Sequence, residues 1–250
     1  MSRYDFNAQR LFVEEELSPA ARITPDRDRA HYLLNVLRLR EGASILLFNG
    51  RDGEWRAEIA EAGRKNLALE VIENVRAQTT APDILYAFAP LKHARLDYMI
   101  QKAVEMGAAR LAPVVTQHTQ AQRVNLERMR ANAIEAAEQC GVLHVPVIDP
   151  ETKLTRFLES LDEDRLLVFC DEDADVNDPV AALRAISPAP DRLAVLIGPE
   201  GGFSEDERAL ILHRKNIARL SLGPRILRAD TAAVAALTAA QIALGDWRSG

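Results

Sequence analysis

The sequence contains few of the residues that mark a disulfide-linked, metal-binding or membrane-spanning protein. Its 250 residues include only two cysteines, Cys140 and Cys170, whose separation fits no metal-binding spacing. Reduced thiols and no metal site are therefore predicted. No apolar run approaches the ~20 residues of a membrane-spanning helix, and the polar N-terminal segment MSRYDFNAQR lacks the apolar core of a signal peptide. We expect a cytoplasmic protein with no membrane contact.

The chain also lacks an excess of basic residues, because 37 acids outnumber 31 lysines and arginines and the net charge is −6. This balance alone argues weakly against nucleic-acid binding. However, nine acids and a single base lie between Glu159 and Asp178, so the rest of the surface is close to neutral. Basic residues cluster near the start of the chain and again at Arg225 and Arg228. Charge therefore neither shows nor excludes a nucleic-acid partner.

The pattern of apolar residues divides the chain into two parts. Residues 1–76 contain short, partly alternating segments bounded by glycine or asparagine, which predict strands, and the segment NGRDG predicts a hairpin turn. One helix is expected here, capped by Thr24, with Pro25 at its first position and residues 26–39 following. Small β units of this kind are usually barrels or sandwiches. The polar residues 76–82 predict a linker.

From residue 83 onward, near-continuous apolar strands alternate with helices. This alternation predicts an α/β domain with a parallel sheet covered on both faces. The last predicted helix, residues 231–245, is apolar around its whole circumference. Such a helix must be buried on every side. It therefore lies at the centre of its domain or also packs against a second subunit.

Two loops containing Gly-Pro follow two successive predicted strands, at Gly198–Pro199 and Gly223–Pro224. Neither is a phosphate-binding loop, because GxxxxGK[ST] and GxGxxG are both missing. Moreover, the first loop carries Glu200, and a capping box from Ser204 to Glu207 already occupies the free N–H groups of the next helix. One alternative is a plain strand-to-helix turn. If the two strands are neighbours, however, the loops form one wall of a pocket for a flat heterocycle.

Together, the segments LIGPEGGFSEDE and LGPRILRADTA closely resemble the RsmE family of the SPOUT superfamily. HYLLNVLRLREGASILLFNG, LKHARLDYMIQKAVEMGAARLAPVVT and EAAEQCG extend the similarity over nearly the whole chain. The resemblance implies an α/β fold, with a SPOUT-type parallel sheet and a C-terminal trefoil knot at residues 83–250. A small PUA-like β-barrel that binds RNA precedes it at residues 1–76. The knot follows from the resemblance alone, since general topology rules disfavour threaded chains.

The same resemblance implies an activity. It is the S-adenosylmethionine-dependent methylation of N3 of one uridine in 16S ribosomal RNA of the small ribosomal subunit. A homodimer with its pocket near the subunit interface is implied as well. Two alternatives stay open, a SPOUT methyltransferase acting on another RNA such as transfer RNA, and a non-catalytic RNA-binding protein of the same fold. Nucleotide hydrolysis is the function that the sequence supports least, because no phosphate-loop lysine is present.

The resemblance places the cofactor against the main chain of the two loops, at Ile197, Gly198, Gly201, Leu222, Gly223 and Leu227. Glu200 is expected to order its loop, to face the positive sulfonium or amino group of the cofactor, or simply to face solvent. Possible RNA contacts are Arg22, His31, Arg38 and Lys92. Since His31 and Arg38 are seven residues apart, they are predicted to share a helix face.

Two residues are candidates for the chemistry. Transfer from a sulfonium is an in-line displacement, and a uridine N3 must lose its proton before it attacks. Arg228 is expected to orient or stabilise the uracil oxygens, or to bind a phosphate. Asp230 is expected to act as a base or to position water, or to cap the following helix. The family often has glutamate at the position of Asp230, so the carboxylate here is one methylene shorter.

Overall fold

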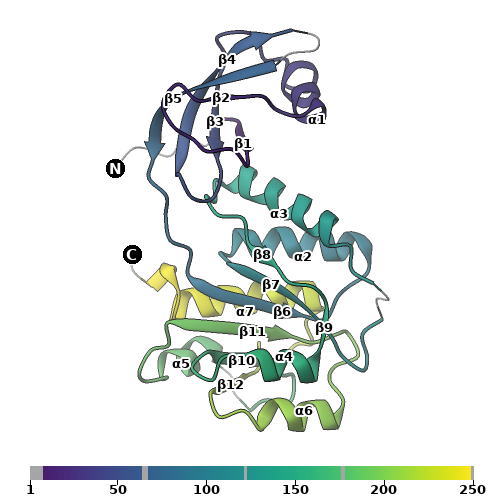
Figure 1. Ribbon diagram of the computed structural model, residues 1–250. Helices are drawn as coiled ribbons and strands as arrows, with labels where there is room; N and C mark the ends of the chain where they lie inside the picture. The colour runs from purple at the N-terminus through teal and green to yellow at the C-terminus, as the bar shows by residue number, and fades with distance from the viewer. Residues whose placement is uncertain (1–7, 64–66, 121–122, 176–177, 249–250) are drawn as a thin grey trace. The chain divides into compact units, whose positions relative to one another are not determined.

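The computed structural model describes residues 8–63, 67–120, 123–175 and 178–248 (Figure 1). The chain divides into two compact units, one comprising Met1–Thr80 with Ala137–Val145 and the other Ala81–Ala136 with Pro146–Gly250. Residues 1–7, which begin the predicted N-terminal domain, and residues 249–250, which end the predicted C-terminal domain, lie outside the described residues. The predicted domain limits, 1–76 and 83–250, stay predictions. The predicted linker, residues 76–82, overlaps the last residue of β5, Arg76, and its remaining residues, 77–82, contain no helix or strand.

The first unit is built on a five-stranded sheet in the order β1-β3-β4-β5-β2. The β1–β3 pair is parallel and the other pairs are antiparallel. Its core includes Ile45 and Leu47 from one strand and Leu69 and Val71 from another, because alternate side chains of a strand face the same side. The strands are β1 Arg10–Phe12, β2 Arg22–Ile23, β3 Ser44–Phe48, β4 Glu54–Ala62 and β5 Leu67–Arg76.

The helix of this unit begins later than predicted. Asp26, rather than Thr24, is the N-cap of α1 (Arg27–His31), and its carboxylate accepts a hydrogen bond from the Arg29 N–H at 2.9 Å. The helix continues as a π-helical turn, η1 (Tyr32–Val36). The prediction of a shared helix face for His31 and Arg38 is wrong, because Arg38 lies beyond the helix end with a left-handed φ of 57°.

The second unit contains a parallel sheet in the order β12-β10-β11-β6-β7-β8, with β9 also paired to β7. Every pairing in it is parallel, which confirms the predicted architecture. Helices cover both faces of a parallel sheet, so the side chains on both faces of its strands are buried and the strands are apolar along nearly their whole length. The strands are β6 Asp83–Phe88, β7 Arg110–Val115, β8 Val147–Ile148, β9 Thr152–Lys153, β10 Leu166–Cys170, β11 Arg192–Ile197 and β12 Ile217–Leu220.

The helices of the second unit form layers on the sheet (Figure 1). Phe157 of α4 and Ile211 of α6 join alternate strand residues in one core cluster. Helix α7 packs with α2, α5 and β11, and its residues Val234, Ala235 and Ile242 stay partly exposed. The helices are α2 His93–Glu105, α3 Leu126–Cys140, α4 Leu154–Ser160, α5 Pro179–Arg184, α6 Glu205–Leu212, α7 Ala229–Ala243 and the 3-10 turn η2 Asp246–Arg248. The last residues of α3, 137–140, belong to the first unit.

The acidic stretch 159–178 is more than a solvated face. Its Asp171 carboxylate is only 2% exposed and forms ion pairs with Arg208 and Arg219. Its single base, Arg165, is buried and donates to the Asp83 carboxylate at 2.8 Å and to the Leu193 carbonyl at 2.9 Å. These acids and their partners therefore contribute to the packing of the second unit.

The hairpin turn at NGRDG offers a test of backbone geometry. Gly53 has a φ of +85°, and a Cβ there would collide with the Arg76 carbonyl oxygen and come within 3.0 Å of the Gln78 nitrogen. Gly42 in the same unit has a φ of +81° but nothing within 4 Å of a Cβ. Gly53→Ala is therefore expected to lower the free energy of unfolding by roughly 1–3 kcal/mol more than Gly42→Ala. Urea unfolding followed by Trp fluorescence measures both losses, and equal losses would contradict the predicted collision.

Candidate active site

A cavity of about 420 Å³ lies where β10, β11 and β12 end at one edge of the parallel sheet. Ligands of open parallel sheets bind beyond the carboxyl ends of the strands, so this is the expected position for a site. The walls are the segments that follow the three strands, together with the starts of α6 and α7. The lining comprises residues 170–172, 197–200, 202–203, 208, 221–229 and 232.

The two Gly-Pro loops do line one cavity, but the strands before them are not neighbours. β10 lies between β11 and β12, with Phe169 aligned to Leu196 on one side and to Arg219 on the other. The end of β10 therefore supplies a third wall, made of Cys170, Asp171 and Glu172, which the sequence reasoning missed. The strand-end rule that singled out the glycine loops would have found this wall if applied to β10.

The structure brings most of the predicted cofactor residues to this cavity. Gly201 is the exception among them, since it lies outside the lining. Nδ1 of His118, in the β7–α3 loop, is 3.1 Å from the carbonyl oxygens of both Gly201 and Gly202, so Nδ1 carries the proton and donates. His118 therefore holds the glycine loop in place, while the Gln117 N–H donates to the Glu207 carboxylate of α6 at 2.7 Å. The predicted residues in the lining are Ile197, Gly198, Glu200, Leu222, Gly223 and Leu227.

Gly198 has a packing role that the sequence did not reveal. A Cβ at this position would lie 2.5 Å from Cε2 of Phe203, whose ring packs edge-on against Phe169 with centroids 5.3 Å apart. The space beside the glycine is thus filled by an aromatic ring of the same loop. A larger residue at Gly198 would disturb this packing before it met any ligand.

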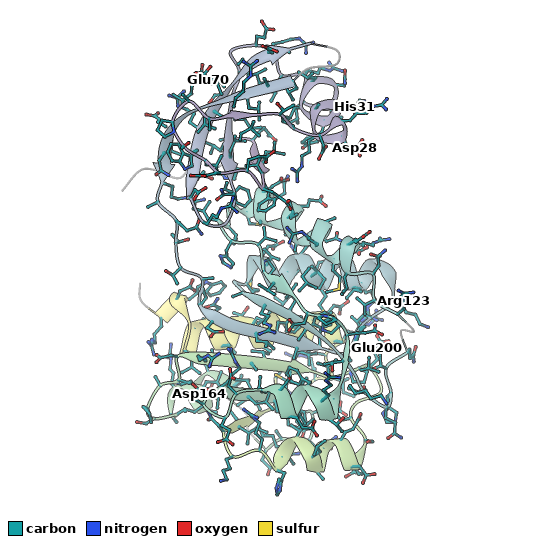
Figure 2. The ribbon with its side chains drawn as sticks, in the orientation of Figure 1. Asp28, His31, Glu70, Arg123, Asp164 and Glu200 are labelled. Carbon is teal, nitrogen blue, oxygen red and sulfur yellow. The ribbon has the colours of Figure 1, made fainter. Side chains whose placement is uncertain are left out.

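Arg95, in the first turn of α2, joins two acids from distant parts of the chain. Its guanidinium forms an ion pair with Glu200 in the loop after β11 and donates through Nε to the Asp230 carboxylate at 3.0 Å. Glu200 is labelled in Figure 2. The partners are 105 and 135 residues away in sequence, so no local pattern could have identified Arg95. The ion pair supports the loop-ordering role among those considered for Glu200.

Asp230 is a poor candidate for a general base. The hydrogen bond from Arg95, aided by the backbone N–H of Thr231, lowers the pKa of its carboxyl. A carboxylate with a lowered pKa holds a proton less readily, so it is less effective in removing one. Nor does Asp230 cap the helix, because Arg228 is the N-cap residue of α7 and Asp230 lies within the first turn. The geometry therefore favours a positioning role.

Arg228 is exposed, lines the cavity and forms the N-cap of α7 without a side-chain hydrogen bond. Among the residues that the structure describes, none pairs with the guanidinium of Arg228 or of the neighbouring Arg225. Ile226 between them is 91% exposed. The mouth of the cavity thus presents two available cations around an apolar side chain.

Cys170 lines the cavity, and its thiol is protonated at neutral pH. Burial, together with the charge of Asp171, raises the pKa of its thiol to about 12. Asp171 itself is held by Arg208 at 2.6 Å and by Nε of Arg219 at 2.7 Å. The β10 wall is therefore held at Asp171 by two ion pairs, and the Cys170 sulfur in it carries no charge.

The predicted RNA contacts lie in both units. Arg22 forms an exposed ion pair with Glu61. His31 on α1, labelled in Figure 2, is exposed, as is Arg38. Lys92 is exposed and immediately precedes α2 in the second unit. Their contact with RNA stays a prediction.

Neither metal ligands nor membrane-spanning elements are found in the described residues. Within them, no group of three or more His, Cys, Asp or Glu side chains could hold a metal ion. The helices described in residues 8–248 include none that is long and apolar enough to cross a membrane.

Comparison with known proteins identifies the family. Residues 79–241 match the family described as "RNA methyltransferase domain", which is more than half of the chain. The chain belongs to this RNA methyltransferase family. Residues 25–72 match the "RNA methyltransferase PUA domain".

Relatives are similar to this family member along nearly its whole length. A ribosomal RNA small subunit methyltransferase E from Rickettsia conorii is 32% identical over 91% of this chain and 93% of its own. The protein of the same name from Bacillus subtilis is 28% identical over 92% of this chain and 95% of its own.

A solved structure agrees with the fold. The ribosomal RNA small subunit methyltransferase E from Neisseria gonorrhoeae, solved with S-adenosyl methionine, has a TM-score of 0.85 and 25% identity over 94% of this chain and 97% of its own. The α/β fold with a parallel sheet and a PUA-like N-terminal domain is thereby confirmed.

The Arg95 ion pairs predict a pH-dependent stability. Because the pKa of Asp230 is lowered in the folded chain, the pair stabilises above the ordinary carboxyl pKa of about 4 and is lost as pH falls through the lowered value. Arg95→Gln is expected to cost about 1 kcal/mol at pH 7, since both partners are partly exposed, and much less near pH 3. Thermal unfolding of the wild type and of Arg95→Gln between pH 3 and 8 measures this difference in stability.

A matched variant separates the ion pair from a general change of charge. Arg156 on α4 is exposed, and no described residue pairs with it, so Arg156→Gln removes the same charge without breaking a contact. A loss of stability in Arg95→Gln that does not change with pH would contradict the interpretation. So would an equal loss of stability in Arg156→Gln.

Proposed function

We propose that this chain is an S-adenosylmethionine-dependent methyltransferase that methylates N3 of one uridine in 16S ribosomal RNA of the small ribosomal subunit. The observation that carries the proposal is the cavity at the ends of β10, β11 and β12, lined by both motif loops. The printed name of the relatives, ribosomal RNA small subunit methyltransferase E, supports the substrate. Methylation at N3 of a uridine rests on the motif resemblance.

The residues present fit the cofactor. The cavity volume, about 420 Å³, lies in the range of small-molecule sites. Its wall offers apolar side chains, including Leu222 and Leu227, beside the bare backbone of Gly202 and Gly223, which suits an adenosine held by main-chain groups. When bound, S-adenosylmethionine would supply an electrophilic methyl group on its sulfonium. The structure of the Neisseria gonorrhoeae relative with S-adenosyl methionine supports this assignment.

Arg228 is the residue proposed to act on the substrate. A uridine N3 that loses its proton leaves negative charge on the neighbouring carbonyl oxygens, and a guanidinium beside them stabilises that charge. Arg228 is exposed at the cavity and has no partner among the described residues, so it is available for this role. Asp230 is proposed to act indirectly, by fixing the start of α7 through Arg95.

Three further properties belong to this proposal. The partly exposed residues Val234, Ala235 and Ile242 lie on one face of α7 by helical spacing, and we propose that a second subunit covers them in a homodimer. A trefoil knot at the C-terminal end is proposed from the motif resemblance. Action in the cytoplasm follows from the proposed ribosomal substrate.

Deletion of the gene tests the proposed activity. Nucleoside mass spectrometry of 16S ribosomal RNA is expected to show the loss of one 3-methyluridine, which returns when the wild-type gene is restored. Persistence at full level would overturn the proposal. Loss of a modified nucleoside from transfer RNA instead would favour the alternative substrate, and no loss in any RNA would favour the non-catalytic protein.

Substitution of Arg228 tests the proposed chemistry. Arg228→Ala is expected to lower kcat about 100-fold or more, because charge developing on the uracil oxygens loses its cation. The Kd for S-adenosylmethionine should stay within about twofold, since the proposed contacts of the cofactor are mainly main-chain groups. Single-turnover methyl transfer to 16S ribosomal RNA and calorimetry measure the two quantities. A higher KM for RNA with unchanged kcat would instead assign Arg228 to a phosphate.

A further inference from the structure

The cavity is lined by three carboxylates, and two of them are already neutralised by arginines. Asp171 is 2% exposed and forms ion pairs with Arg208 and Arg219. Glu200 forms an ion pair with Arg95. Neither carboxylate retains a full negative charge to offer a ligand, because its nearest counter-ion is part of the protein.

Glu172 differs from these two acids. It is exposed and lines the same cavity, yet no described residue donates a hydrogen bond to its carboxylate or forms an ion pair with it. Its Oε1 lies only 3.4 Å from the position that a Cβ would take on Gly202. The carboxylate of Glu172, in the wall that follows β10, therefore lies close to the bare backbone of the glycine loop that follows β11.

An uncompensated carboxylate in a ligand cavity favours a positively charged ligand. A ligand that fills the cavity removes water from the carboxylate, and this desolvation is costly unless an opposite charge replaces the water. Arg225 and Arg228 are not suitable counter-ions within the chain, since neither forms an ion pair with Glu172. Both cations remain available for anionic groups of a substrate.

We propose that Glu172 is the carboxylate that pairs with the positively charged end of bound S-adenosylmethionine, which carries a sulfonium and an ammonium group. This inference rests on the proposed function of the cavity and names a contact within it. It also reassigns the role considered for Glu200 from the sequence, because Arg95 already compensates that charge.

Calorimetry with Glu172→Gln and three ligands tests the inference. S-adenosylmethionine carries both cationic groups, S-adenosylhomocysteine keeps the ammonium alone, and 5′-methylthioadenosine has neither. The Kd of S-adenosylmethionine is expected to rise about tenfold, and that of 5′-methylthioadenosine to stay within about twofold. If the Kd of S-adenosylhomocysteine rises as much as that of S-adenosylmethionine, the ammonium is the partner of Glu172. If the Kd of S-adenosylhomocysteine does not rise, the sulfonium is the partner.

A control variant in the same loop isolates the local contact. Asp175 follows β10 as Glu172 does and is exposed, but it lies outside the cavity lining. Asp175→Asn removes the same charge and should leave all three affinities unchanged. Equal losses in the two variants would mean a long-range effect of net charge and would overturn the inference.

The remaining outcomes separate this inference from the function on which it rests. If the wild-type chain binds S-adenosylmethionine and Glu172→Gln binds it equally well, the inference fails and the proposed function stands. The inference also fails if the substitution weakens the binding of 5′-methylthioadenosine as much as that of S-adenosylmethionine, because the substitution would then have changed the shape of the cavity. If the wild-type chain binds none of the three ligands, the proposed cofactor itself is wrong.

Discussion

The arrangement of the site depends on one guanidinium. Arg95 holds Glu200, in the loop after β11, and Asp230, in the first turn of α7, so three segments are fixed relative to one another by two ion pairs. Both acids raise the pKa of Arg95, which keeps it charged at every relevant pH. On its other side the glycine loop is held by His118, whose Nδ1 donates to the Gly201 and Gly202 carbonyls, and by the packing of Phe203 against Phe169.

The architecture of the second unit could be predicted from sequence because its signals are local. Apolar runs such as 193–197 are fully buried in strands, and the Ser204–Glu207 capping box is formed as the residues indicate. The position of the site also followed, since both motif loops come directly after strands. Strand order could not be predicted in the same way. Nothing in the residues 217–220 says that β10, rather than β11, is their neighbour.

The errors about single residues have physical causes as well. A glycine does not reveal what it approaches, so the sequence could not show that the ring of Phe203 fills the space beside Gly198. Thr24 looked like a cap, but Asp26 captures the free N–H because its carboxylate is the stronger acceptor. Arg95 and Glu172 were missed because their roles depend on partners, or on a lack of them, that only the folded chain defines.

The protonated thiol of Cys170 has a consequence for the durability of the protein. Sulfur nucleophiles attack methyl donors as thiolates, and the raised pKa of the Cys170 thiol leaves very little of it in that form at pH 7. The burial that packs β10 thus also makes the cavity wall chemically inert. A cavity proposed to hold an alkylating agent can in this way contain a cysteine without methylating itself.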